Sequence, residues 1–152
     1  PSDNLSEHTP AETFGDSEQD VAFGGRRFRI CLRDTSGQEP YARLNDLSYT
    51  GGMCFLMCFS MEQGREATLS NIVTTWFPAL RAGGHLDHGA CLILVGTSRG
   101  SRLLQDNVES KAEEVAQDIG ARLFVTLSLE PESQDGALKL LREAMRAMTE
   151  MN

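Results

Sequence analysis

Residues 34–61 read DTSGQEPYARLNDLSYTGGMCFLMCFSM and contain the segment that decides the fold. Within them, residues 53–59 (MCFLMCF) form a continuous apolar run, which predicts a strand buried on both faces. Residues 90–95 (ACLILV) form a second such run, and residues 122–127 (RLFVTL) predict a third strand. Apolar strands that alternate with helical segments are typical of a parallel sheet covered by helices.

Segments with apolar residues at helical spacing lie between and after these strands. We expect one helix over residues 66–82, with a kink or break at Pro78, because proline cannot donate a helical hydrogen bond. A second helix is expected over residues 108–119, with Asn107 as its N-cap, and a third along residues 138–148. The sequence therefore predicts an α/β fold with a mostly parallel sheet and helices on both faces.

The N-terminal part of the chain predicts a β-hairpin. Two short strand-like runs, residues 21–23 and 26–32, flank the pair Gly24-Gly25, which suits a two-residue turn with positive φ at both positions. The second run alternates apolar side chains with arginines, so we interpret the arginines as the solvated face of a strand. In a parallel sheet ligands bind beyond the carboxyl ends of the strands. Candidate binding loops are therefore 34–39, 60–65, 96–106 and 128–135.

The charge of the chain is concentrated at its N-terminus. Its 14 basic and 22 acidic side chains give a net charge of −8, and residues 1–20 hold six acids with no Lys or Arg. We divide the chain into this acidic segment, expected to be mobile, and a globular domain over residues 21–152. The rest of the chain has no basic surplus to neutralise phosphates, which disfavours a nucleic-acid partner.

Several targeting features are not found in the sequence. There is no apolar run long enough to span a membrane, no secretory signal at the start and no prenylation cysteine at the end, so we expect a cytoplasmic protein without a membrane anchor. The cysteines match no zinc-binding spacing and are interpreted as reduced core residues. They are Cys31, Cys54, Cys58 and Cys91.

Three stretches carry a resemblance to a known family. Residues 34–44 (DTSGQEPYARL), 47–49 (LSY) and 55–61 (FLMCFSM) resemble the Ras superfamily of small GTPases and look closest to its Rho branch. The likeness covers about residues 12–148, although segment 97–120 has the length seen in the Ras and Rab branches. It implies a P-loop-NTPase-like fold, GTP or GDP with Mg²⁺ as cofactors, and protein effectors or regulators as partners.

The resemblance assigns roles to individual residues. It makes Asp34 a Mg²⁺ ligand, Gly37 a phosphate-binding residue and Gln38 the residue that positions the attacking water. It also places Thr97 and Ser128 in the two motifs that bind guanine. The residues themselves leave an alternative open for two of these roles, those of Gln38 and Asp34. In the alternative for Gln38, it is a relic on a loop that holds no phosphate. In the alternative for Asp34, its side chain caps backbone N–H groups at a strand end.

A second set of residues corresponds to the switch segments through which the family contacts its partners. The alternative for Leu44 and Leu47 is that they cover the sheet. The set comprises Phe14, Tyr41, Leu44 and Leu47.

The chain also departs from the family pattern. It contains no GxxxxGK[ST] phosphate loop and no strand and helix to flank one. The guanine motif [NT]KxD is replaced by residues 97–100 (TSRG), so Gly100 stands where the family has the Asp that accepts two guanine N–H groups. Losing two such bonds corresponds to roughly 10²–10⁴ in affinity. The second guanine motif retains only Ser128, and Glu12 falls near the position of the family's Mg²⁺-binding Thr.

Three hypotheses follow from these observations. The first is a degenerate small GTPase that acts as a protein-interaction module. The second is a working GTP-binding and GTP-hydrolysing switch whose phosphate loop lies upstream of this chain. The third is an unrelated doubly wound domain that binds another anionic cofactor. We interpret His85 and His88 as part of a solvated loop rather than a metal site.

A missing first strand would leave two strands without a neighbour. These are the strand that ends at Leu32 and the strand over residues 53–59. We therefore expect the sheet to close up, residues 1–20 to fill the gap, or a second copy to pair with the exposed edge and make a homo-oligomer.

Overall fold

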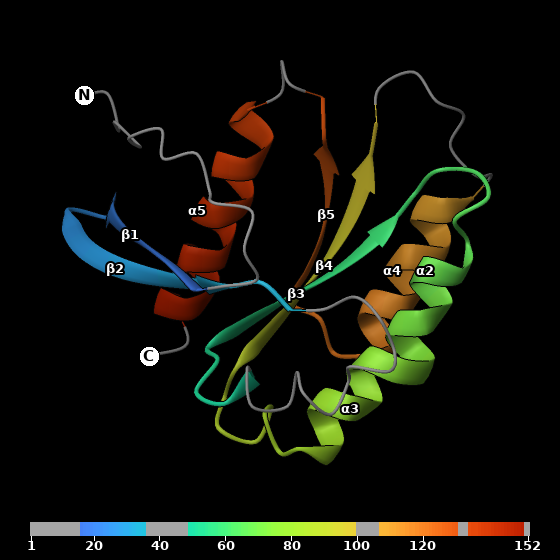
Figure 1. The fold of residues 1–152 in the computed structure, drawn as a ribbon, viewed down its shortest axis with the longest axis horizontal. Coiled ribbons are helices and arrows are strands. Elements are labelled where there is room, and N and C mark those ends of the chain that lie inside the picture. The colour runs from blue at the N-terminus through green and yellow to red at the C-terminus, as the bar shows by residue number, and fades with distance from the viewer. Residues whose placement is uncertain (1–15, 36–48, 100–106, 131–133, 151–152) are drawn as a thin grey trace. The chain divides into compact units, whose positions relative to one another are not determined.

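A computed structural model describes residues 16–35, 49–99, 107–130 and 134–150 of the chain (Figure 1). Six of the predicted site residues lie outside these ranges, namely Gly37, Gln38, Phe14, Tyr41, Leu44 and Leu47. Contacts within the chain divide it into two units, residues 1–48 and residues 49–152, which are described separately below.

The first unit contains the predicted hairpin. Strand β1 (Asp16–Phe23) pairs antiparallel with β2 (Arg26–Arg33), and Phe23 lies opposite Arg26. Gly24 and Gly25 have φ values of 58° and 77°, which confirms the two-residue turn. The strand begins inside the acidic segment, where the Asp20 carboxylate lies 3.2 Å from the Arg29 guanidinium of the register partner.

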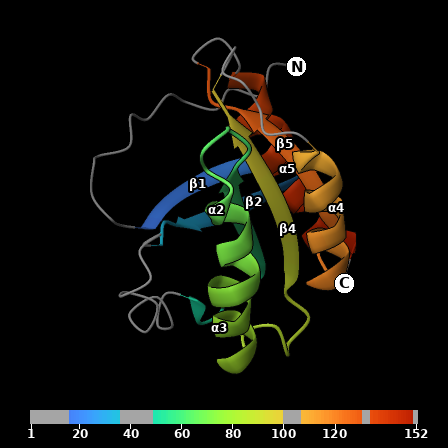
Figure 2. The same cartoon turned by 90° about the vertical axis from the view of Figure 1, so that its right-hand side faces the viewer.

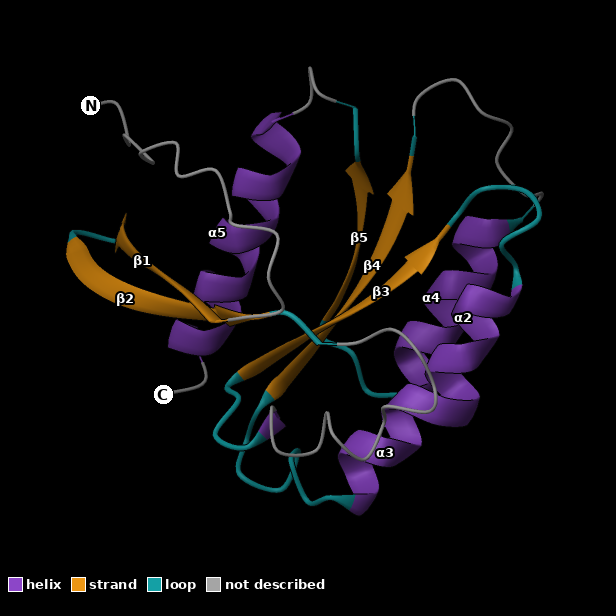
Figure 3. Cartoon of the chain, in the orientation of Figure 1, coloured by secondary structure: helices purple, strands orange, loops and turns teal. Residues whose placement is uncertain are grey.

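The second unit is built on a three-stranded parallel sheet (Figure 3). Its strands are β3 (Cys54–Ser60), β4 (Cys91–Ser98) and β5 (Leu123–Ser128), in the order β3-β4-β5. The prediction of a parallel sheet interleaved with helices is confirmed. Within this sheet β4 is the central strand, with β3 and β5 on either side of it.

A single helical run follows β3 and changes its winding in the middle. It consists of α2 (Ala67–Asn71), the π-helical turn η2 (Ile72–Trp76) and α3 (Phe77–Ala82). The π turn ends at Trp76, two residues before Pro78, whose ring and missing N–H disfavour a regular α-helical turn at this point. The helical run continues through Pro78 to Ala82, so the proline is accompanied by a change of winding and not by the predicted break.

Two further helices complete the unit. Helix α4 (Val108–Asp118) follows Asn107, and α5 (Gln134–Glu150) ends the described chain. Asn107 is the N-cap of α4, as predicted, but it adopts a left-handed conformation with φ 59° and makes no side-chain cap hydrogen bond. Asparagine tolerates this conformation better than most residues. Gly120, at φ 71°, confirms the predicted end of the helix.

The helices cover both faces of the sheet (Figure 2). One face of β4, including Leu94, packs with residues of the α2–α3 run and α4 around Ile72 and Ala112. The other face, including Ile93 and Val95, packs against α5. Residues 91–95 of β4 are at most 5% exposed, so the prediction of a strand buried on both faces is confirmed for β4.

The same prediction is wrong for β3. Met57 and Phe59 are buried on the face toward α4, but on the opposite face Leu56 is 40% exposed and Cys58 is exposed. The apolar cluster under α5 reaches Cys54 at the start of β3 and does not include Leu56. An apolar run shows that a strand can be buried, but coverage depends on which helix reaches it.

The interpretation of the cysteines as core residues holds for only part of the set. Cys91 is buried and Cys54 is half-buried, whereas Cys31 and Cys58 are exposed. All four are free cysteines in the structure.

Candidate functional site

The candidate site lies at the carboxyl ends of β3, β4 and β5. Ser60 of β3 is the register partner of Thr97 in β4, and Ser98 is the partner of Ser128 in β5. Parallel strands end at the same edge of a sheet, so Thr97 and Ser128, the two residues predicted to contact guanine, lie on neighbouring strand ends. Figure 1 shows these ends at the tips of the three arrows.

Thr97 joins the ends of β3 and β4. Its hydroxyl donates to the backbone carbonyl of Phe59 at 3.1 Å, and its own carbonyl accepts the N–H of Met61 at 2.9 Å. The side chain is therefore used to hold the two strands together where β3 turns into its loop. This bond would have to break before the hydroxyl could donate to a ligand.

The loop between β3 and α2 is fixed by Thr68. Its hydroxyl accepts the N–H of Ser60 at 2.9 Å and donates to the carbonyl of Arg65 at 2.7 Å. A hydroxyl with one donor and two lone pairs can make both bonds at once. This arrangement holds the loop residues close to the ends of the strands.

Glu62 in this loop reaches the segment after β4. Its carboxylate accepts the backbone N–H of Arg99 at 3.0 Å, and its own N–H donates to the Ser60 hydroxyl at 3.3 Å. The Glu62 carboxylate is thus hydrogen-bonded to the segment that corresponds to the family's guanine motif, residues 97–100. Sequence reasoning missed Glu62, although its position directly after a strand, inside the candidate loop 60–65, was a signal for it.

Ser128 is also engaged within the protein. Its hydroxyl oxygen accepts the N–H of Glu130 at 3.4 Å, and the N–H of Leu129 donates to the carbonyl of Ser98 at 2.8 Å. The loop after β5 is therefore tied to the end of β4 through backbone atoms. Ser128 shapes this loop in the structure.

Asp34 is the only other predicted site residue within the described part of the chain. It is exposed and follows directly after β2, in the first of the two units. Within the described ranges, no group of three or more His, Cys, Asp or Glu side chains is arranged to hold a metal ion. Asp34 contributes at most one carboxylate to a Mg²⁺ ion, which commonly keeps several water ligands.

These residues do not fit guanine recognition as the family performs it. Position 100 is glycine and supplies no carboxylate to the guanine N–H groups. The acidic group in the described part of this region, Glu62, is bonded to the Arg99 backbone, and the Thr97 hydroxyl is bonded to a backbone carbonyl.

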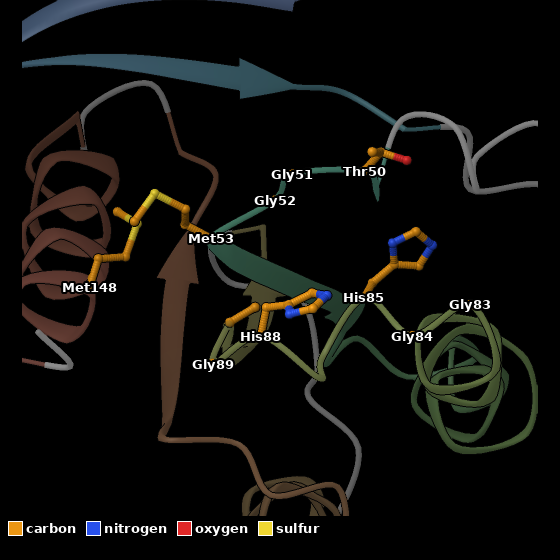
Figure 4. Close-up of a pocket in the computed structure, with 11 residues that line it drawn as sticks. Thr50, Gly51, Gly52, Met53, Gly83, Gly84, His85, His88, Gly89 and Met148 are labelled. Carbon is orange, nitrogen blue, oxygen red and sulfur yellow. The ribbon is translucent and has the colours of Figure 1, made fainter.

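A cavity of about 500 Å³ lies at the opposite end of the sheet, beside the start of β3 (Figure 4). Its lining includes Met53, Met148 and the two histidines of the loop before β4. His88 is exposed, and the ring of His85 packs edge-on against Tyr49 at 5.4 Å between centroids. His85 is thus held by an aromatic contact and is not a fully solvated loop residue.

No helix in the described part of the chain is long and apolar enough to cross a membrane.

Comparison with known proteins places the chain in a family. Residues 3–148 match the sequence profile of the Ras family. The chain is 28% identical over 131 residues to a Ras-like GTP-binding protein RhoL of Drosophila melanogaster, 38% identical over 97 residues to a GTP-binding RHO-like protein of Candida albicans, and 33% identical over 121 residues to a GTP-binding protein Rho1 of Kluyveromyces lactis. These alignments cover 84%, 64% and 72% of this chain. They span 65%, 26% and 56% of the relatives' own lengths.

Proposed function

Because the chain belongs to the Ras family of small GTPases and is similar to its Rho-like members, we propose that it is a protein-interaction module that binds guanine nucleotides weakly or not at all. The observation that carries this proposal is that the guanine motif lacks its carboxylate. Gly100 replaces the recognising carboxylate, and the neighbouring Arg99 backbone is bonded to Glu62.

The energetic argument concerns the two hydrogen bonds that guanine loses. A carboxylate at position 100 would accept two N–H groups of the base, each bond contributing about 1.5–3 kcal/mol because the acceptor is charged. Glycine removes both, which corresponds to a loss of roughly 10²–10⁴ in affinity. Glu62 adds a negative charge beside the site and disfavours an anionic ligand there.

The polar groups at the strand ends support the same proposal. The Thr97 hydroxyl donates inside the protein, so a ligand that accepts from it would have to replace that bond, and the Ser128 hydroxyl oxygen accepts the Glu130 N–H in the loop after β5. These internal hydrogen bonds support the proposal that the fold serves contacts with other proteins and not the binding of a nucleotide.

We propose that the partner is a protein effector or regulator rather than a nucleic acid, and that the module works in cytoplasmic signalling. The contact residues would be those that match the family's switch segments. They are Phe14, Tyr41, Leu44 and Leu47. A second contact of the proposed module is the pairing of another copy of the chain with an exposed sheet edge.

A GTP-binding and GTP-hydrolysing switch is the second candidate function. Residues 34–39 (DTSGQE) favour it, because they keep Asp34 for Mg²⁺, Gly37 for a phosphate and Gln38 for water positioning. The curated relatives are named GTP-binding proteins and are longer than the matched region. In this case the phosphate loop would lie upstream of residue 1.

The nucleotide carried by the purified protein separates the two candidates. The protein made from its whole gene is purified with Mg²⁺, denatured, and the released nucleotides are quantified by chromatography, with the Gly100→Asp variant treated in parallel. The proposal predicts far less than one guanine nucleotide per chain for the unmodified protein. About one GTP or GDP per chain would support the switch instead.

A further inference from the structure

Two cysteines lie directly opposite each other on neighbouring strands. Cys54 of β3 is the register partner of Cys91 in β4, and the Cys91 N–H donates to the carbonyl of Met53 at 3.0 Å. Adjacent strands lie about 4.8 Å apart, which is inside the range of about 4.4–6.8 Å between the Cα atoms of disulfide-bonded cysteines. Register partners at this general strand spacing are close enough for a disulfide between their side chains.

Both thiols are on the face of the sheet that α5 covers. Cys54 packs against the cluster formed by Ile93, Val95 and Ala144 of α5. Cys91 lies two residues before Ile93 in the same strand, and residues two apart in a strand point to the same face. The two side chains are thus neighbours on one surface, at the end of the sheet opposite the candidate nucleotide site.

The surroundings of the two thiols shift their pKa values in opposite directions. A hydrogen bond from Cys54, together with a backbone N–H and the nearby positive charge of Arg122, lowers the pKa of Cys91 to about 7 against the effect of burial. The same hydrogen bond, together with burial, raises the pKa of Cys54. The Arg122 backbone N–H donates to the carbonyl of Leu92 at 2.8 Å, and its guanidinium is paired with the Glu150 carboxylate. The hydrogen bond between the two thiols therefore favours the thiolate at Cys91 and the protonated thiol at Cys54.

We propose that Cys54 and Cys91 form a redox site that a hydroperoxide such as hydrogen peroxide converts into an intramolecular disulfide. In the first step the Cys91 thiolate attacks one peroxide oxygen, the O–O bond breaks, and a sulfenic acid and hydroxide form. In the second step the Cys54 sulfur attacks the Cys91 sulfur. The S–O bond breaks, the hydroxyl leaves with the Cys54 proton as water, and the peroxide has taken up two electrons.

The other two cysteines lack this arrangement. Cys58 is opposite Val95, and its thiol donates to the carbonyl of Leu56 at 3.9 Å. Cys31 is opposite Glu18 in the hairpin. All four cysteines lie within the described residues, and Cys54 with Cys91 is the one pair among them that shares a register position. Cys54 is half-buried, so solvent has access to the pair from its side.

Mass spectrometry of the full chain tests the proposal. The reduced protein is treated with hydrogen peroxide, denatured and alkylated, and its intact mass is measured. We expect two of the four cysteines to escape alkylation, a mass about 2 Da below that of the reduced thiols before alkylation, and full reversal by a dithiol reductant. These results require that the link forms within one chain.

Variants identify the linked residues. Trypsin leaves Cys54 and Cys58 in one peptide, because no Lys or Arg lies between them, so digestion alone cannot distinguish them. The link must persist in Cys58→Ser and in the matched control Cys31→Ser, and must be lost in Cys54→Ser.

Three results would overturn the proposal: a link that survives Cys54→Ser, a link between two chains, or irreversible sulfinic acid at Cys91 in place of a link. Circular dichroism shows whether Cys54→Ser is folded. If that variant is unfolded, the Cys58→Ser digest still decides, because a peptide containing residue 54 linked to one containing Cys91 is then unambiguous. The outcome does not depend on nucleotide binding.

Discussion

Truncation of Ile93 and of Leu56 should have very different costs, although the two residues are register partners on the same face of the sheet. Ile93 is fully buried under α5, whereas Leu56 is 40% exposed. Ile93→Ala removes buried methyl groups and leaves a cavity, which costs about 2–5 kcal/mol. Leu56→Ala loses only the transfer free energy of a partly exposed side chain, about 1 kcal/mol, and leaves no closed cavity.

The assay is urea denaturation of both variants and of the unmodified chain, followed by circular dichroism, with free energies of unfolding compared at equal slope. A difference of at least about 1 kcal/mol between the two variants is expected. Equal losses would refute the reasoning, because they would mean that Leu56 is covered as completely as Ile93. If the two variants lose equal free energies of unfolding only at high protein concentration, a second copy of the chain covers Leu56.

Three further predictions concern single interactions. Glu62→Ala removes the acceptor of the Arg99 N–H, so amide hydrogen exchange at Arg99 should become faster, while Glu62→Gln, which keeps an acceptor, should show a smaller change. In a background with Cys31 and Cys58 replaced by Ser, Cys54→Ala should raise the pKa of Cys91 from about 7 toward the ordinary thiol value of 9.0, because the hydrogen bond to the thiolate is lost. The absorbance of the thiolate measured against pH gives this pKa. An unchanged or lower midpoint would contradict the prediction. Gly25→Ala should destabilise the hairpin by about 1 kcal/mol, because φ is 77° at this position. Proteolysis near the turn should therefore become faster. A variant as resistant to proteolysis as the unmodified chain would count against the turn geometry.

Local sequence patterns were enough to predict much of the fold. The apolar run at residues 90–95, the 3.6-residue spacing over 66–82 and the Gly24-Gly25 pair each produced the expected element, because their causes are local. The change of winding before Pro78 is local as well, since proline acts on the turn that precedes it.

Other features depend on residues that only the fold brings together. Glu62 and Arg99 are 37 positions apart in sequence, and the parallel pairing of β3 with β4 makes them neighbours. The pairing of Cys54 with Cys91 depends on strand register in the same way. The exposure of Leu56 was missed because seven consecutive apolar residues carry no information about which helix reaches each face.

The central claim is that this chain keeps the Ras-family scaffold but binds guanine nucleotide weakly or not at all. The most direct test is the dissociation constant of a fluorescent GTP analogue with Mg²⁺, measured on the protein made from its whole gene, with an ATP analogue as control. We predict a dissociation constant weaker than about 1 μM and no preference for GTP over ATP. Saturable binding of GTP far below about 1 μM, with ATP excluded, would contradict the claim.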